Sequence, residues 1–141
     1  LAQRRPGATV LAATSSQRDQ ELFRSILPAA GWRVECVSSG RDALRYLWRN
    51  RVFVVICDAA LTDGAWHELF EEALNLDPAP SFIVAAAPGE WLQAPPFAQG
   101  KLAFVAKPYR EEQVLAATAA ALEHKPKRPV RSEVDLCPVS G

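Results

Sequence analysis

The chain has no methionine, only three cysteines among its 141 residues, and no surplus of charge of either sign. Its 16 basic and 16 acidic side chains balance, so bulk attraction to nucleic acid or to an anionic membrane gains no support. No apolar stretch approaches the roughly 20 residues of a membrane span, and no signal peptide is visible. Because methionine is absent, we expect the true start of the protein to precede Leu1.

The cysteines are too few and too widely spaced to predict a disulfide framework or a metal site. Cys36, Cys57 and Cys137 form no closely spaced pair, and their number is odd. This usage is typical of a reducing compartment, so we expect a cytoplasmic protein. Cys36 and Cys57 are predicted to behave as small core residues.

The sequence also lacks the common motifs of catalysis. No glycine-rich phosphate loop, serine–histidine–aspartate arrangement or zinc-ligand spacing is present, and we therefore expect no enzymatic activity. His67 and His124 are isolated and are predicted to be surface residues without a metal. A basic cluster near the end is interpreted as a solvated linker, with nucleic-acid contact as a lesser alternative: Lys125, Lys127, Arg128 and Arg131.

The stretch from Arg51 to Gly64 is the most informative part of the chain. Val52 to Cys57 is an unbroken apolar run, which is typical of a strand buried on both faces of a parallel sheet. The run ends on Asp58, and Thr62-Asp63-Gly64 then supplies turn chemistry. In open parallel sheets, functional groups gather outside the carboxyl ends of the strands, which is where this pattern places Asp58.

Strands and helices alternate along the rest of the chain. Further strands are predicted at 9–13, 32–37, 81–86 and 102–106, and helices follow Ser16, Ser39, Ala65 and Arg110. The alternation predicts an α/β fold, a doubly wound (βα)5 flavodoxin-like sandwich of three layers around a five-stranded parallel sheet. We expect the four tryptophans to be packing residues: Trp32, Trp48, Trp66 and Trp91.

Proline marks the irregular parts of the chain. Pro95-Pro96 would break a helix, so residues 88–100 are predicted to hold one short helical turn or an irregular loop. We assign residues 1–7 to a leader, 8–125 to one domain and 126–141 to a proline-rich linker or tail.

Three segments, in order, resemble the receiver domain of bacterial two-component response regulators. They are VLAATSS at 10–16, VVICDAALTDG at 54–64 and FVAKP at 104–108. The resemblance implies that Asp58 accepts a phosphoryl group from the histidine of a sensor kinase. It also implies that Lys107 and the backbone carbonyl of Ala60 lie at the phosphoryl and metal site, that Phe104 is the aromatic switch residue, and that the Lys107–Pro108 bond is cis.

The chain departs from the family at three other positions. Thr14 and Ser15 stand where the family has two acidic residues that hold Mg²⁺. Ala85, or Ala86 if the register slips by one, stands where the family has a switch serine or threonine. One carboxylate and two hydroxyls make a poor Mg²⁺ site, so we expect no metal and no other cofactor. The remaining Asp58–Lys107 pair has balanced charge, and the two side chains are predicted to approach closely.

Three functions are weighed on this basis. The first is a receiver domain that is still phosphorylated on Asp58, and the second is a degenerate receiver that acts as a protein-interaction module without phosphate. The third, a flavodoxin-like enzyme or small-molecule binder, has no motif in its favour. We favour the second, because a metal-dependent phosphoryl transfer rarely survives the loss of most metal ligands. The expected partner is a sensor histidine kinase or another signalling protein; an output domain after residue 141 and a second copy of the chain are left open.

Overall fold

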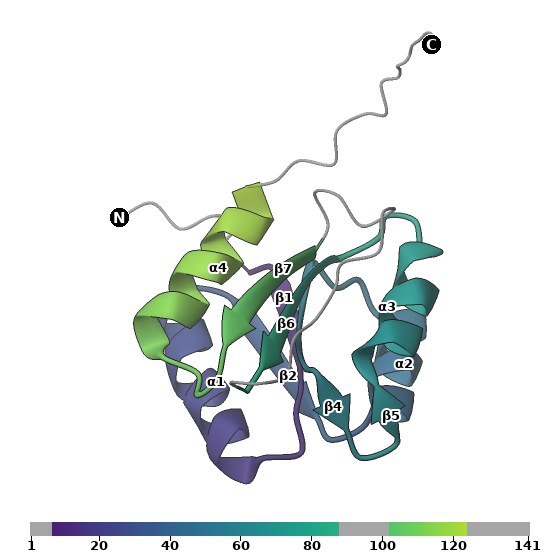
Figure 1. Ribbon diagram of the computed structural model, residues 1–141. Coiled ribbons are helices and arrows are strands. Elements are labelled where there is room, and N and C mark those ends of the chain that lie inside the picture. Colours follow the sequence, from purple (N-terminus) through teal and green to yellow (C-terminus); the bar gives the residue numbers. More distant parts are fainter. Residues whose placement is uncertain (1–6, 88–101, 124–141) are drawn as a thin grey trace, which may run out of the picture.

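A parallel sheet of five strands forms the centre of the molecule. The computed structural model describes residues 7–87 and 102–123 (Figure 1). The strand order is β2-β1-β3-β6-β7, and every neighbouring pair is parallel. The predicted α/β architecture is therefore confirmed, with these strand bounds: β1 Thr9–Ala13, β2 Arg33–Val37, β3 Val54–Asp58, β6 Ser81–Ala86 and β7 Leu102–Ala106.

The burial of each strand follows from its residues. All five residues of β3 are buried, as its unbroken apolar run predicts, and it lies between β1 and β6. β2 alternates polar and apolar residues and lies at one edge of the sheet. This position fits the pattern, because an edge strand is only half covered.

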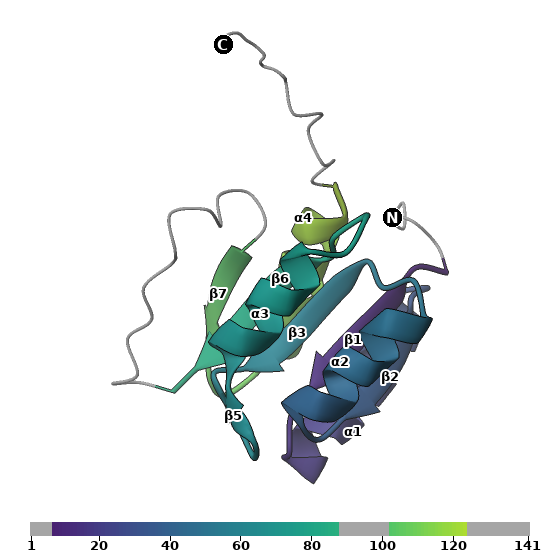
Figure 2. The same cartoon turned by 90° about the vertical axis from the view of Figure 1, so that its right-hand side faces the viewer.

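Two pairs of helices cover the two faces of the sheet (Figures 1 and 2). One pair is α1 Gln17–Ala29 and α4 Glu111–Glu123, whose buried residues pack with Val54 and Ile56 of β3. The other pair is α2 Gly40–Arg49 and α3 Trp66–Leu74, which pack with the alternate residues Val55 and Cys57. Successive side chains of a strand point to opposite faces, so β3 contributes to both cores.

The serines predicted to start the first two helices are their N-caps. The side chain of Ser16 accepts a hydrogen bond from the backbone N–H of Asp19, and that of Ser39 accepts one from Asp42. Each cap satisfies one of the donors that a helix leaves free at its start.

A small hairpin after β3 was not predicted from the sequence. Its strands are β4 Ala60–Leu61 and β5 Gly64–Ala65, which pair antiparallel around Thr62 and Asp63. The Asp63 carboxylate accepts hydrogen bonds from the backbone N–H groups of Gly40 and Arg41, at 2.8 and 2.9 Å. Asp63 therefore joins the hairpin to the N-terminus of α2, where a negative charge is favoured.

The prediction that the tryptophans are packing residues is wrong for Trp48. Its exposed fraction is 64%, whereas Trp32 and Trp66 are buried. α2 buries a narrow stripe, Ala43 and Leu47, and Trp48 lies beyond that stripe.

Several predictions fall wholly or mainly outside the described residues. These are the leader at 1–7 apart from Gly7, the loop at 88–100 with Trp91, and the tail with His124 and Cys137. Across residues 7–87 and 102–123, each helix falls short of the length and apolarity needed to cross a bilayer.

Candidate functional site

Asp58 is the last residue of β3, and it lies buried at the carboxyl edge of the sheet. Its exposed fraction is 5%. The flanking strands β1 and β6 end beside it, so residues that follow β1 and β7 can also reach this edge. The position agrees with the prediction from the apolar run that precedes Asp58.

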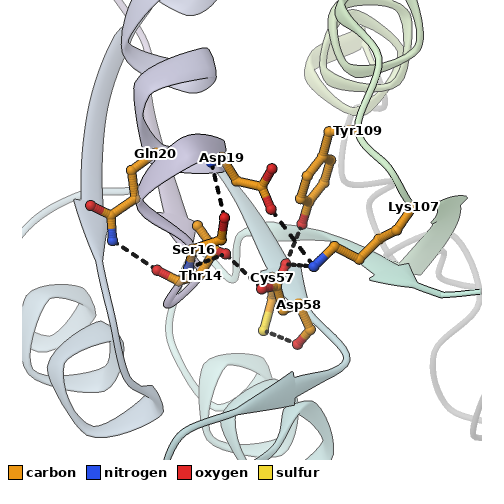
Figure 3. A network of polar contacts seen from close by, with 8 residues as sticks. All are labelled: Thr14, Ser16, Asp19, Gln20, Cys57, Asp58, Lys107 and Tyr109. Carbon is orange, nitrogen blue, oxygen red and sulfur yellow. Dashed lines mark hydrogen bonds and ion pairs between the residues drawn. The ribbon is translucent and has the colours of Figure 1, made fainter.

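Three side chains contact the Asp58 carboxylate (Figure 3). The hydroxyl of Thr14 donates a hydrogen bond to Oδ2 at 2.6 Å, and the hydroxyl of Tyr109 donates one to Oδ1 at 2.7 Å. The ammonium of Lys107 lies 3.3 Å from Oδ1. The predicted approach of Lys107 to Asp58 is thus present, and both carboxylate oxygens have donors.

Thr14 is held in place by the turn between β1 and α1. It is completely buried, and its hydroxyl oxygen accepts a hydrogen bond from the backbone N–H of Ser16 while its proton goes to Asp58. The amide of Gln20 donates to the Thr14 carbonyl at 2.8 Å. Thr14 therefore has little freedom to turn away from Asp58, because each of these polar groups has a partner.

Tyr109 is a site residue that the sequence reasoning missed. Tyr109 is 8% exposed, and its ring packs edge-to-face on Phe23 of α1, with ring centroids 4.8 Å apart. Burial, and then the negative charge of Asp58, raise the pKa of the Tyr109 phenol well above its usual range. The hydroxyl therefore stays protonated and acts as a donor. A signal was available, since Tyr109 lies only two residues after Lys107.

Lys107 bridges two carboxylates, one of which was also missed. Its ammonium lies 3.7 Å from Oδ2 of Asp19 in addition to its contact with Asp58. The exposed side-chain fractions are 27% for Lys107 and 18% for Asp19, so the outer ion pair is more solvated than Asp58 at 8%. Lys107 and Asp19 line an open hollow at the surface.

Comparison with known proteins gives a match in structure alone. No family model matches the chain, and neither does any curated protein sequence. The structure is similar to a receiver domain from Clostridium thermocellum, with TM-score 0.72, 18% identity, and coverage of 92% of this chain and 99% of that one. It is also similar to the signal receiver domain of a Luxo repressor protein from Vibrio parahaemolyticus, with TM-score 0.74, 22% identity, and coverage of 92% of this chain and 95% of that one.

A CheY-like receiver domain from Methylobacillus flagellatus matches with TM-score 0.69 and 20% identity, over 82% of this chain and 98% of that one. The chain has the receiver-domain fold. The resemblance inferred from three short segments is confirmed at the level of the fold.

Within this receiver fold, the remaining predicted site residues lie around Asp58 at different depths. Ser15 is exposed, unlike its neighbour Thr14. Ala60 is exposed in β4, two residues after Asp58. Ala85 is completely buried and pairs in register with Asp58, and its carbonyl accepts a hydrogen bond from the N–H of Ala59 at 2.8 Å.

Phe104 and the Lys107–Pro108 bond complete the set. Phe104 is 40% exposed, and its ring meets Trp66 edge-to-face at 5.9 Å between centroids. The Lys107–Pro108 peptide bond is cis, as the resemblance implied.

The donors around Asp58 do not fit Mg²⁺. This cation prefers six oxygen ligands, several of them carboxylate or water. Here Asp58 Oδ1 already meets a hydroxyl and an ammonium, and Oδ2 meets the Thr14 hydroxyl. In the part of the chain that the structure describes, no three histidine, cysteine or acidic side chains gather as a ligand set.

Proposed function

We propose that this chain is a receiver module of the two-component type that signals through protein contacts while Asp58 stays unphosphorylated. The observation that carries the proposal is the set of contacts on Asp58. Thr14, Tyr109 and Lys107 together supply donors to both carboxylate oxygens. The proposal involves neither an enzymatic activity nor a cofactor.

These contacts oppose phosphoryl transfer in two ways. An ionised carboxylate has about four acceptor positions, and hydrogen bonds from Tyr109 and Thr14 with the Lys107 ammonium already occupy three of them, which makes the oxygens less nucleophilic. A hydrogen bond to a charged group contributes about 1.5–3 kcal/mol, so breaking one reduces the rate by roughly tenfold to a hundredfold. The transferring group also gathers negative charge, and no acidic pair is present to bring a divalent cation to it.

The two switch positions, Ala85 and Phe104, also support this proposal. Ala85 lies beside Asp58 in register but has no hydroxyl with which to hold a phosphoryl oxygen. Phe104 already rests against Trp66 and is partly exposed. A module whose binding surface stays constant needs neither a hydroxyl at position 85 nor a movement of Phe104. These residues therefore agree with binding that is independent of phosphate.

The partner in this proposal is a signalling protein, either a sensor histidine kinase or a downstream protein. A cytoplasmic location follows from the same proposal. The similar structures are signal receiver and response regulator receiver domains, which supports this partner class.

Incubation with a small phosphodonor and Mg²⁺, followed by intact mass measurement, tests the proposal. We expect no phosphate mass shift on the natural chain. Asp58→Asn is the control for site specificity, and Tyr109→Phe with Ser15→Asp serves as a variant in which labelling should rise. Substantial labelling of the natural chain that disappears in Asp58→Asn would overturn the proposal.

A conventional receiver domain is the second candidate, and one observation favours it. The Lys107 ammonium lies 3.3 Å from Asp58 Oδ1, where it could also contact a phosphoryl oxygen. The two candidates differ in partner binding, because a conventional receiver changes its affinity on labelling. The proposed module binds its partner equally well with Asp58 and with Asp58→Asn.

A further inference from the structure

A second surface lies on the side of the sheet that α2 and α3 cover. These helices run side by side on that side, toward the viewer in Figure 2. We call their outer surface the α2–α3 face, and define it by three arginines of α2, the exposed Trp48 and two glutamates of α3: Arg41, Arg45, Arg49, Trp48, Glu68 and Glu72. All six side chains are exposed.

Charge is segregated between the two helices. α2 carries three arginines and one aspartate, whereas α3 carries three glutamates and neither lysine nor arginine. The three arginines recur every four residues, as do Glu68 and Glu72, so each set forms a stripe along its helix. A basic stripe thus lies beside an acidic stripe on one surface.

Among the residues that the structure describes, no ion pair joins one stripe to the other. Over the described residues, the ion pair recorded on this face joins Arg45 to Asp42 of the same helix at 3.4 Å, and both side chains are about half exposed. A groove of about 580 Å³ lies between the two helices, and Leu44, Trp48 and Leu69 are among its lining residues. The charges of both stripes are therefore available to a partner.

We propose that the α2–α3 face binds a second copy of this chain in a two-fold symmetric dimer. A two-fold axis through the groove would place the basic α2 of one copy against the acidic α3 of the other, and the same contact would form twice. Arginine–carboxylate pairs would then form across the interface. A purely basic or purely acidic partner would meet repulsion from one of the two stripes.

Trp48 supplies the apolar centre that such an interface requires. It is the more exposed of the two large exposed apolar side chains in the described residues, at 64% against 40% for Phe104. Tryptophan and arginine are enriched among residues that dominate protein–protein binding energy. In the dimer, each Trp48 would cover apolar groove residues of the other copy.

The expected dimer is weak and reversible. Helices of 10 and 9 residues are roughly 15 and 14 Å long, which provides less area than the roughly 800 Å² per partner of a standard interface. The pairs are also exposed to solvent, so added salt should weaken the dimer. This proposal does not rest on the role assigned to Asp58, because none of its residues contacts that side chain.

Sedimentation velocity over a series of concentrations, with charge-swapped variants, tests the dimer. Variant one is Arg45→Glu with Arg49→Glu, which makes both helices acidic. Variant two is Glu68→Lys with Glu72→Lys, which makes both helices basic. Each should be monomeric alone, and an equimolar mixture should form a heterodimer, because opposite charges then meet at both contacts.

Two further variants complete the test. Trp48→Ser should raise the dissociation constant about tenfold or more, as expected for a central interface residue. Arg18→Glu with Arg24→Glu, at exposed positions of α1 on the other side of the sheet, should leave the dimer unchanged. A natural chain that stays monomeric throughout the series would overturn the proposal, as would a mixture of the two variants that fails to associate. Phosphate labelling of Asp58 is measured separately, so failure of one proposal is distinguishable from failure of the other.

Discussion

The hydroxyl of Tyr109 donates a hydrogen bond to Oδ1 of Asp58 at 2.7 Å, across 51 positions of the chain. This contact ties the residue after Pro108 to the end of the central strand β3. It also means that a single oxygen atom on Tyr109 can be removed to test what the contact does, with little change in the packing of the ring on Phe23.

Tyr109→Phe should make Asp58 more reactive and the fold less stable. The variant keeps the ring but removes one donor from a buried carboxylate, which still contacts Thr14 and Lys107. We expect the free energy of unfolding in urea to fall by about 1.5–3 kcal/mol, the usual contribution of a hydrogen bond to a charged group. Tyr46→Phe, which removes the other tyrosine hydroxyl, should change it by much less. Equal losses in the two variants would contradict the assignment.

The ionisation of Tyr109 should be coupled to unfolding at alkaline pH. Burial and the charge of Asp58 raise its pKa in the folded chain, so the stability from this group is fully present below the unfolded pKa of about 10. It is lost as the pH rises toward the folded value. In a Tyr46→Phe background, phenolate absorbance should therefore appear together with the loss of circular dichroism. Phenolate that forms while the fold is intact would show that Tyr109 is not buried against Asp58 as described.

Asp63 should stabilise the fold at neutral pH and cease to do so in acid. Hydrogen bonds from the N–H groups of Gly40 and Arg41 lower the pKa of Asp63. A carboxyl group with a lowered pKa contributes stability above its unfolded pKa, and that contribution is lost as the pH falls through the folded value. The difference in unfolding free energy between the natural chain and Asp63→Ala should thus shrink in acid. A difference that is constant with pH would exclude the charge as its cause.

Introducing acidic residues at positions 14 and 15 should create a Mg²⁺ site. Thr14 is completely buried against Asp58, so Thr14→Asp places a second carboxylate beside the first and should destabilise the metal-free chain. Ser15→Asp is at an exposed position and should be tolerated. Calorimetric titration of the double variant should show Mg²⁺ binding, and added Mg²⁺ should raise its thermal stability. The natural chain, titrated in parallel, should show neither effect.

The sequence was sufficient where local pattern decides the structure. The apolar run before Asp58 predicted a central strand, and Ser16 and Ser39 were recognisable as helix caps. The approach of Lys107 to Asp58 was predicted because the segment FVAKP resembles the last strand of a receiver domain.

The missed features depend on contacts between distant segments. Tyr109 reaches Asp58 only because β7 and α4 are placed beside α1, which no local pattern contains. Asp63 was interpreted as a turn residue, whereas its carboxylate binds the start of another helix. Trp48 has the spacing of a packing residue, but the sequence does not say how wide a stripe α2 buries.

The hydrogen bonds of Asp63 link the end of β3 at Asp58 to the α2–α3 face. The hairpin that carries Asp63 begins two residues after Asp58, and its carboxylate is bonded to the first residues of α2. A covalent change at Asp58 that displaced the hairpin would pull on the helix that carries Arg45 and Trp48. If that change lowered the affinity of the dimer by some factor, formation of the dimer would disfavour the change at Asp58 by the same factor, because the coupling free energy is reciprocal. The short β4–β5 hairpin, which Asp63 joins to α2, would thus couple Asp58 to the α2–α3 face.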